Sequence, residues 1–237
     1  MRGLIAAFQL LTRLPMPAVS GTAPANAAGW FPWVGLVVGA LVALPLAWVP
    51  DPRLAALLAL GLWVWVTGGL HLDGLADLAD ALGVAHRDRA RFVAVLADSH
   101  VGSFGVIALI LQLLAKFVLL WLLAETAHGW LALPLIAAWA RLGALIWGQT
   151  LPPLKPGLGA RFVWRGGRWA SLAGLLLLLT ASAVWVPVLL VAPLALATWW
   201  LFLRRRLGGM SGDCLGAGIE LVEMVLVAVI IVPPILF

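Results

Sequence analysis

Long runs of apolar residues, separated by short polar connections, follow one another along most of the chain. A helix of about 20 apolar residues is long enough to cross a lipid bilayer. Seven runs approach or reach this length and predict transmembrane helices, roughly at Trp30–Val49, Leu54–Leu72, Ser103–Leu123, Trp130–Thr150, Trp169–Val186, Pro187–Leu203 and Gly218–Val232. We therefore expect an all-α, polytopic membrane bundle that forms a single domain over residues 1–237.

Two parts of this pattern are less regular. Pro187 and Pro193 interrupt one continuous apolar run. Because proline tends to end a helix, we expect two short helices joined by a tight turn there. Near the start, Arg2–Pro17 has the pattern of an amphipathic entry helix closed by Pro15 and Pro17.

The composition supports a membrane protein. The chain is 64% hydrophobic and only 11% charged, it contains 14 Trp residues, and its mean hydropathy is +1.09. Such values are typical of polytopic membrane proteins rather than of soluble cores. The single cysteine, Cys214, excludes a disulfide within the chain.

The positions of the basic residues predict the orientation. With a cytoplasmic N-terminus, seven crossings place the connections 73–102, 151–168 and 204–217 on the cytoplasmic side. Twelve of the fifteen Lys and Arg residues then lie inside: Arg2, Arg13, Arg87, Arg89, Arg91, Lys155, Arg161, Arg165, Arg168, Arg204, Arg205 and Arg206. This agrees with the positive-inside rule. The placement of basic residues on the cytoplasmic side of the bilayer accounts for the net charge of +5, so no nucleic-acid partner is expected.

The first of these connections is unusually acidic. Residues 71–100 contain five of the ten acidic side chains of the chain, and Asp73, Asp77 and Asp80 have the spacing i, i+4 and i+7. On one helix these three fall within roughly 60° of each other. Stacked carboxylates repel one another unless a cation lies between them. Oxygen ligands alone favour Mg²⁺ or Mn²⁺ over zinc, although a solvated helix face is the simpler alternative.

Two further polar segments adjoin predicted spans. Asp98, Ser99 and His100 precede the third span, where a helix cap would explain one of them but not all three. Asp213 and Glu220 lie seven residues apart in the lead to the last span, so they share a helix face. His71 begins the acidic block and could act as a base or only as a hydrogen-bonded structural residue.

Lys116 and Arg141 fall inside predicted spans, where an unpaired charge is costly. Each could pair with a helix-borne acid, or contact a phosphate of a substrate. Carboxylates that hold Mg²⁺ beside cationic side chains suit phosphoryl or phosphodiester transfer. In such a reaction a carboxylate or histidine takes the proton of the attacking hydroxyl.

Three strings closely resemble the adenosylcobinamide-GDP ribazoletransferase family, also called cobalamin-5'-phosphate synthase. They are TGGLHLDGLADLADAL (67–82), DSHVGSFGVIALILQLLAK (98–116) and LGGMSGDCLGAGIELVE (207–223), and FQLLTRLPMP (8–17) resembles the opening of the family. The likeness follows the chain in order over nearly its whole length, and is weakest in 151–168.

The resemblance implies an inner-membrane enzyme whose site faces the cytoplasm. Its substrates would be adenosylcobinamide-GDP and α-ribazole or its 5'-phosphate, with Mg²⁺ required and GMP released. The metal ligands would be Asp73, Asp77, Asp80, Asp213 and Glu220. Catalysis would involve His71, Asp73, Asp98 and Ser99, and substrate contacts would involve His100, Lys116, Arg141 and Arg91. Ala97 stands where the family commonly has a basic residue, and Arg91 could compensate for it.

Two other functions are alternatives to this one. A CDP-alcohol phosphotransferase also carries aspartates on helices near the membrane surface, but Ala76 is followed by Asp77 where that family has an arginine. A secondary transporter would place charges near the bilayer midplane and show inverted repeats. The sequence is also compatible with a homo-oligomer.

Overall fold

The computed structural model describes residues 2–18, 27–85, 88–98, 100–154 and 168–232, and within them every element of regular secondary structure is helical. The α-helices are α1 (Arg2–Leu11), α2 (Phe31–Trp48), α3 (Pro52–Thr67), α4 (Leu70–Ala85), α5 (Arg89–Val95), α6 (Ser103–Ala124), α7 (Leu133–Thr150), α9 (Arg168–Trp185), α10 (Ala192–Phe202) and α11 (Gly212–Ile231). Short 3-10 turns precede α2, α7 and α10, and a π-helical turn, Leu203–Leu207, follows α10. The all-α bundle expected from the sequence is confirmed.

Among the described residues, six continuous helical stretches are long and apolar enough to cross a membrane, and the bent pair formed by α3 and α4 brings the total to seven if it is one span. The chain is therefore a multi-pass membrane protein. The expected separation at Pro187 is confirmed, because α9 ends at Trp185 and a 3-10 turn begins at Pro187. Two expected boundaries were wrong: α1 ends at Leu11 rather than Pro17, and α11 begins at Gly212 rather than Gly218.

The second expected span is not a single straight helix. The chain turns by 86° between α3 and α4. Gly68 and Gly69 form this break with φ angles of 65° and 73°, a left-handed conformation that glycine adopts without strain. Their N–H groups donate to the carbonyls of Trp65 and Val64, which closes the end of α3. The break lets α4 leave the direction of α3 and carry its acidic face to one end of the bundle.

Small residues allow α2 and α7 to pack closely. Gly35 and Gly39 form a G-x-x-x-G pattern on α2, and a Cβ atom built on Gly35 would lie 2.5 Å from the carbonyl oxygen of Ala137. Gly39 lies directly against the backbone of Leu133. Backbones approach in this way at helix interfaces in membranes, where close van der Waals packing drives association.

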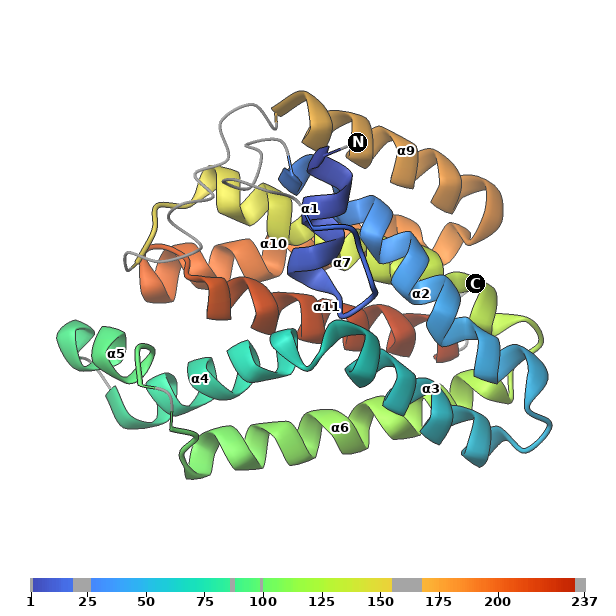
Figure 1. Ribbon diagram of the computed structural model, residues 1–237, viewed down its shortest axis with the longest axis horizontal. Helices are drawn as coiled ribbons and strands as arrows, with labels where there is room; N and C mark the ends of the chain where they lie inside the picture. Colours follow the sequence, from blue (N-terminus) through green and yellow to red (C-terminus); the bar gives the residue numbers. More distant parts are fainter. Residues whose placement is uncertain (1, 19–26, 86–87, 99, 155–167, 233–237) are drawn as a thin grey trace.

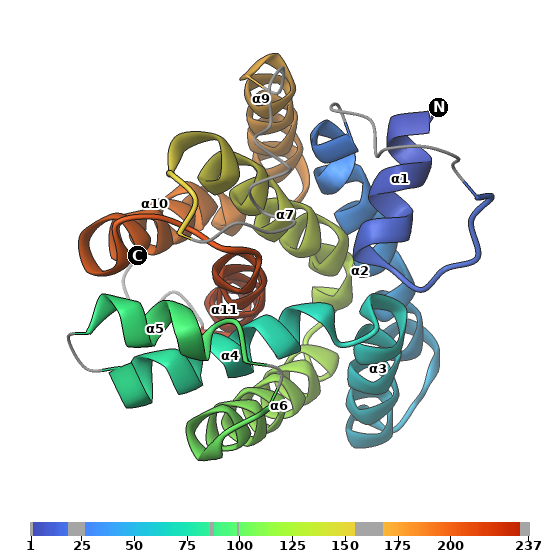
Figure 2. The same cartoon turned by 60° about the vertical axis from the view of Figure 1, so that its left-hand side comes forward.

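Helix α11 occupies the centre of the bundle. Figure 2 shows it almost end-on, with α4, α6, α7 and α10 around it, and each of these helices contacts it. In Figure 1, α4 runs toward the left-hand end of the molecule, where α5 and the first turns of α6 and α11 also lie. Large apolar side chains on the outer faces, such as Leu57, Leu111 and Leu176, are exposed, as expected of surfaces that face lipid.

Candidate active site at the crossing of α4 and α11

The acidic helix α4 is in backbone contact with the first turns of α11. A Cβ atom built on Gly74 would lie 2.8 Å from the carbonyl oxygen of Asp213, and one built on Gly216 would lie 3.2 Å from the Cα atom of His71. Glycine at these two positions lets the helices touch. The crossing places Asp73 and Asp77, on either side of Gly74 along α4, at the same end of the bundle as Asp213.

The three aspartates that share a face of α4 have different surroundings. The side chain of Asp73 is exposed, that of Asp77 is half-buried and that of Asp80 is only 5% exposed. Asp213 is half-buried and accepts a hydrogen bond from the Ser211 hydroxyl at 3.1 Å. In the described part of the chain, no three His, Cys, Asp or Glu side chains already form a group that could enclose a metal ion.

Asp80 bonds to the start of α6. Its two carboxylate oxygens accept hydrogen bonds from the backbone N–H groups of Gly102, at 2.7 Å, and Gly105, at 2.9 Å. The first N–H groups of a helix have no partner within the helix, so Asp80 caps α6 from a different helix. These two hydrogen bonds join the far end of the acidic face of α4 to the segment that contains Asp98 and His100.

Asp98 and His100 form an exposed pair just before α6. Asp98 Oδ1 accepts hydrogen bonds from the backbone N–H of His100 at 3.0 Å and from its ring Nδ1 at 2.7 Å. The hydrogen bond from the ring lowers the pKa of the Asp98 carboxyl from its ordinary value. The Asp98 carboxylate thus fixes the ring of His100, so that Nε2 is the ring nitrogen free to act as an acid or base.

A buried ion network lies deeper in the bundle and connects three helices. Lys116 on α6 donates to Glu220 and Glu223 on α11, at 2.8 and 2.7 Å, and Arg141 on α7 donates to Glu223 at 2.8 Å. Gln112 also donates to Glu220, at 3.0 Å. All five side chains are buried. Two cations and two anions balance within the network, which reduces the cost of placing charge inside a membrane bundle.

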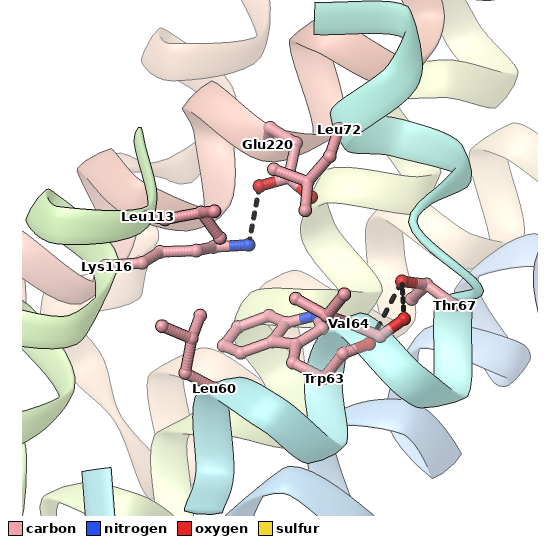
Figure 3. A pocket seen from close by; sticks show the side chains of 8 residues that line it. All are labelled: Leu60, Trp63, Val64, Thr67, Leu72, Leu113, Lys116 and Glu220. Carbon is pink, nitrogen blue, oxygen red and sulfur yellow. Dashed lines mark hydrogen bonds and ion pairs between the residues drawn. The ribbon is translucent and has the colours of Figure 1, made fainter. Parts of the chain in front are cut away.

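The same network borders a small recess at the break between α3 and α4. Figure 3 shows Lys116 and Glu220 facing each other above Trp63, and the Lys116 Nζ atom lies 4.1 Å from the centre of the indole ring. Apolar side chains of α3, α4 and α6 form the remaining walls, together with Thr67. The aromatic face adds a cation–π contact to the two ion pairs of Lys116.

His71 and Arg141 retain unused polar atoms inside the protein. Both ring nitrogens of His71 and the Nε and Nη2 atoms of Arg141 are buried without a hydrogen-bond partner among the described residues. His71 is 2% exposed and Arg141 is fully buried. Both side chains are therefore shielded from solvent, whereas Asp73 is exposed.

The predicted site residues therefore fall into two groups. Asp73, Asp77 and Asp213 belong to the crossing of α4 and α11, Asp98 and His100 precede α6, and Asp80 joins α4 to the start of α6. His71, Lys116, Arg141 and Glu220 are buried deeper, and three of these four belong to the ion network. Arg91 is exposed on α5, while Ser99 and residues 155–167 lie outside the described residues. The roles of all these predicted site residues in metal binding and catalysis stay predictions.

Gln112 and the bridging role of Glu223 were missing from the predicted site. Glu223 bridges Lys116 and Arg141, and Gln112 lies one helical turn before Lys116 on the same face of α6. The i, i+4 spacing of Gln112 and Lys116, and the i, i+3 spacing of Glu220 and Glu223, are the sequence signals that could have revealed them.

Comparison with known proteins identifies the family. The family model described as cobalamin-5-phosphate synthase matches residues 3–231. Proteins named adenosylcobinamide-GDP ribazoletransferase are similar over almost their full length. The one from Laribacter hongkongensis is 59% identical, with 97% of each chain covered. The one from Thiobacillus denitrificans is 56% identical, with 93% of this chain and 91% of the relative covered. No solved structure matches the chain. The chain belongs to the cobalamin-5-phosphate synthase family.

Proposed function

We propose that this membrane protein transfers the adenosylcobinamide-phosphate group of adenosylcobinamide-GDP to α-ribazole or to its 5'-phosphate. The relatives that are 55–59% identical carry the name of this activity. A ribose hydroxyl attacks the cobinamide-linked phosphorus, the P–O bond to the GMP phosphate breaks, and GMP leaves. The product is adenosylcobalamin or its 5'-phosphate. The observation that supports this proposal at the site is the contact of Gly74 with the backbone of Asp213, which brings the acidic segments of two helices to one crossing.

Asp73, Asp77 and Asp213 are the residues that would hold Mg²⁺. Their donor set fits this ion because it consists of carboxylate oxygens at one crossing. Proteins usually bind Mg²⁺ by one or two carboxylates, with waters and substrate phosphates completing the shell. When bound, the ion would neutralise the charge on the diphosphate of the substrate.

The Asp98–His100 pair is suited to accept the proton of the attacking hydroxyl. Its hydrogen bond at 2.7 Å holds the ring in one orientation, and both side chains are exposed. A base must lie within hydrogen-bond reach of the hydroxyl, and the Asp80 cap ties this segment to the acidic helix. Arg91, exposed on the neighbouring α5, is available to contact a phosphate of the nucleotide.

The excess of basic residues on one side predicts that this site faces the cytoplasm across the inner membrane. The function is tested with purified protein in detergent or nanodiscs, supplied with adenosylcobinamide-GDP, α-ribazole and Mg²⁺. We expect equal amounts of GMP and of the corrinoid product, and none after the divalent ion is removed by chelation. A folded protein that yields no GMP would refute the proposal.

A further inference from the structure

Both carboxylate oxygens of Asp80 already serve a structural purpose. Gly102, the N-cap residue of α6, has no side chain that could cap its own helix. Asp80 takes this role across a separation of 22 residues and binds the N–H groups of Gly102 and Gly105. A carboxylate at the N-terminus of a helix also interacts favourably with the helix dipole.

Two glycines make room for this carboxylate. A Cβ atom built on Gly102 would lie 2.5 Å from Asp80 Oδ1, and one built on Gly105 would overlap Asp80 Oδ2 and lie 3.0 Å from the carbonyl oxygen of Ala76. We call Asp80, Gly102 and Gly105 the Asp80 joint. Nearby, Gly83 lies against the ring of Phe104, so the same two helices touch on both sides of the joint.

The Asp80 joint lies between two sets of candidate site residues. Asp80 lies one helical turn beyond Asp77 on the acidic face of α4, and Gly102 follows His100 by two residues. The carboxylate therefore fixes the segment that holds Asp98 and His100 relative to the carboxylates at the α4–α11 crossing. If Asp80 turned to a metal ion instead, the N–H groups of Gly102 and Gly105 would lose their acceptor.

We propose that Asp80 is a positioning residue that sets the Asp98–His100 pair against the acidic face of α4, and that it is not a ligand of the metal ion. This inference rests on the proposed function for the role of the pair in turnover. Asp80 thus has a different role from Asp73 and Asp77, the proposed metal ligands that share its helix face. The bonds of Asp80 also give a physical reason for glycine at both Gly102 and Gly105.

The test compares Asp80→Asn and Gly105→Ala with the wild type. Asp80→Asn keeps the size of the side chain but turns one acceptor into a donor that faces an N–H group, whereas Gly105→Ala disturbs the same joint and leaves the carboxylate intact. Gly61→Ala is the matched control, because a Cβ atom there meets nothing within 4 Å. Gly102→Ala replaces either variant that does not fold.

Three measurements are made on each protein. Hydrogen–deuterium exchange of residues 100–106 should become faster in both joint variants and not in Gly61→Ala. Mn²⁺ binding, followed by electron paramagnetic resonance, should stay as in the wild type. The kcat for GMP release should fall by about 100-fold, as expected when reacting groups are misplaced, with little change in the KM for either substrate.

Two results would overturn the inference. Weaker Mn²⁺ binding in Asp80→Asn than in Gly105→Ala would make Asp80 a ligand. Faster exchange with an unchanged kcat would make the joint structural only. A wild-type protein that releases no GMP would refute the proposed function separately, and the exchange and Mn²⁺ measurements would still decide whether Asp80 holds α6 or the metal.

Discussion

Gly74 on α4 packs directly against the backbone of Asp213 on α11, so that even a Cβ atom at Gly74 would lie 2.8 Å from the Asp213 carbonyl oxygen and 2.9 Å from its Cα atom. Two acidic segments that are far apart in the sequence thereby meet at one end of the bundle. This relationship gives the aspartates of the two helices a common location, and it can be disturbed without changing any charge.

Replacing Gly74 by alanine should reduce turnover strongly, because the added methyl group pushes α4 away from α11. Overpacking of this kind costs about 1–3 kcal/mol, so the protein should still fold with a lower thermal midpoint. The kcat for GMP release and the midpoint are measured side by side. Gly61→Ala, on an exposed part of α3, should change neither, and a Gly74→Ala enzyme with normal turnover would show that the close contact is unnecessary.

Asp73→Asn should lower the rate of GMP release by more than about 100-fold, the upper range for groups that only orient a metal ligand. The exposed position of Asp73 means that folding should be preserved, which size-exclusion chromatography and the thermal midpoint can verify. Glu125→Gln is the control, since Glu125 is exposed at the opposite end of α6 and bonds only locally to Trp121. Near-normal rates for Asp73→Asn would remove this residue from the site.

The buried ion network predicts a rescue. Lys116→Met leaves Glu220 and Glu223 without their shared cation, and breaking a buried pair by removing one partner costs about 3–5 kcal/mol. The second change Glu220→Gln removes one of the two anions while Arg141 still neutralises Glu223, so the double variant should regain much of the lost stability. Thermal unfolding of the four proteins of this cycle gives the coupling energy. If the single variants showed no coupling, Lys116 would not depend on Glu220 in the folded protein.

The acid limb of the pH–rate profile should depend on His100. The hydrogen bond from His100 lowers the pKa of Asp98, so Asp98 keeps its charge to lower pH than an ordinary carboxyl does. His100→Ala removes this bond and the proposed base together. The Asp98 carboxyl should then take up its proton at a higher pH than in the wild type, and the rate of GMP release should be lower at every pH measured. The pH–rate profiles of the two proteins test this, and a His100→Ala profile equal to that of the wild type would separate the pair from the proton transfer.

The sequence predicted the helix that carries the aspartates but not how it bends away from α3. The spacing of Asp73, Asp77 and Asp80 is regular, and α4 places all three on one face as expected. The break at Gly68 and Gly69 lies within an apolar run that reads as one span, because hydropathy reports burial in lipid and not backbone direction. Only the left-handed conformation of the two glycines reveals it.

The partners of individual charges were also beyond what spacing can decide. Lys116 and Arg141 were expected to pair with a helix-borne acid or to contact a phosphate, and the structure shows both in ion pairs with acids of α11. Asp80 and Asp77 are equivalent in the helical pattern, yet Asp80 binds N–H groups of α6. Such differences depend on which helix lies opposite, which the periodicity of one helix does not contain.

The claim on which the account depends most is that α4 and α11 share one divalent ion, and Mn²⁺ binding to Asp73→Asn and Asp213→Asn tests it most directly. Electron paramagnetic resonance of the purified proteins, titrated with Mn²⁺ in the presence of adenosylcobinamide-GDP, gives the Kd for the ion. The account predicts that each variant binds Mn²⁺ more weakly than the wild type, and that combining them adds little because one site is lost. Equal Mn²⁺ binding by the wild type and both variants would contradict it.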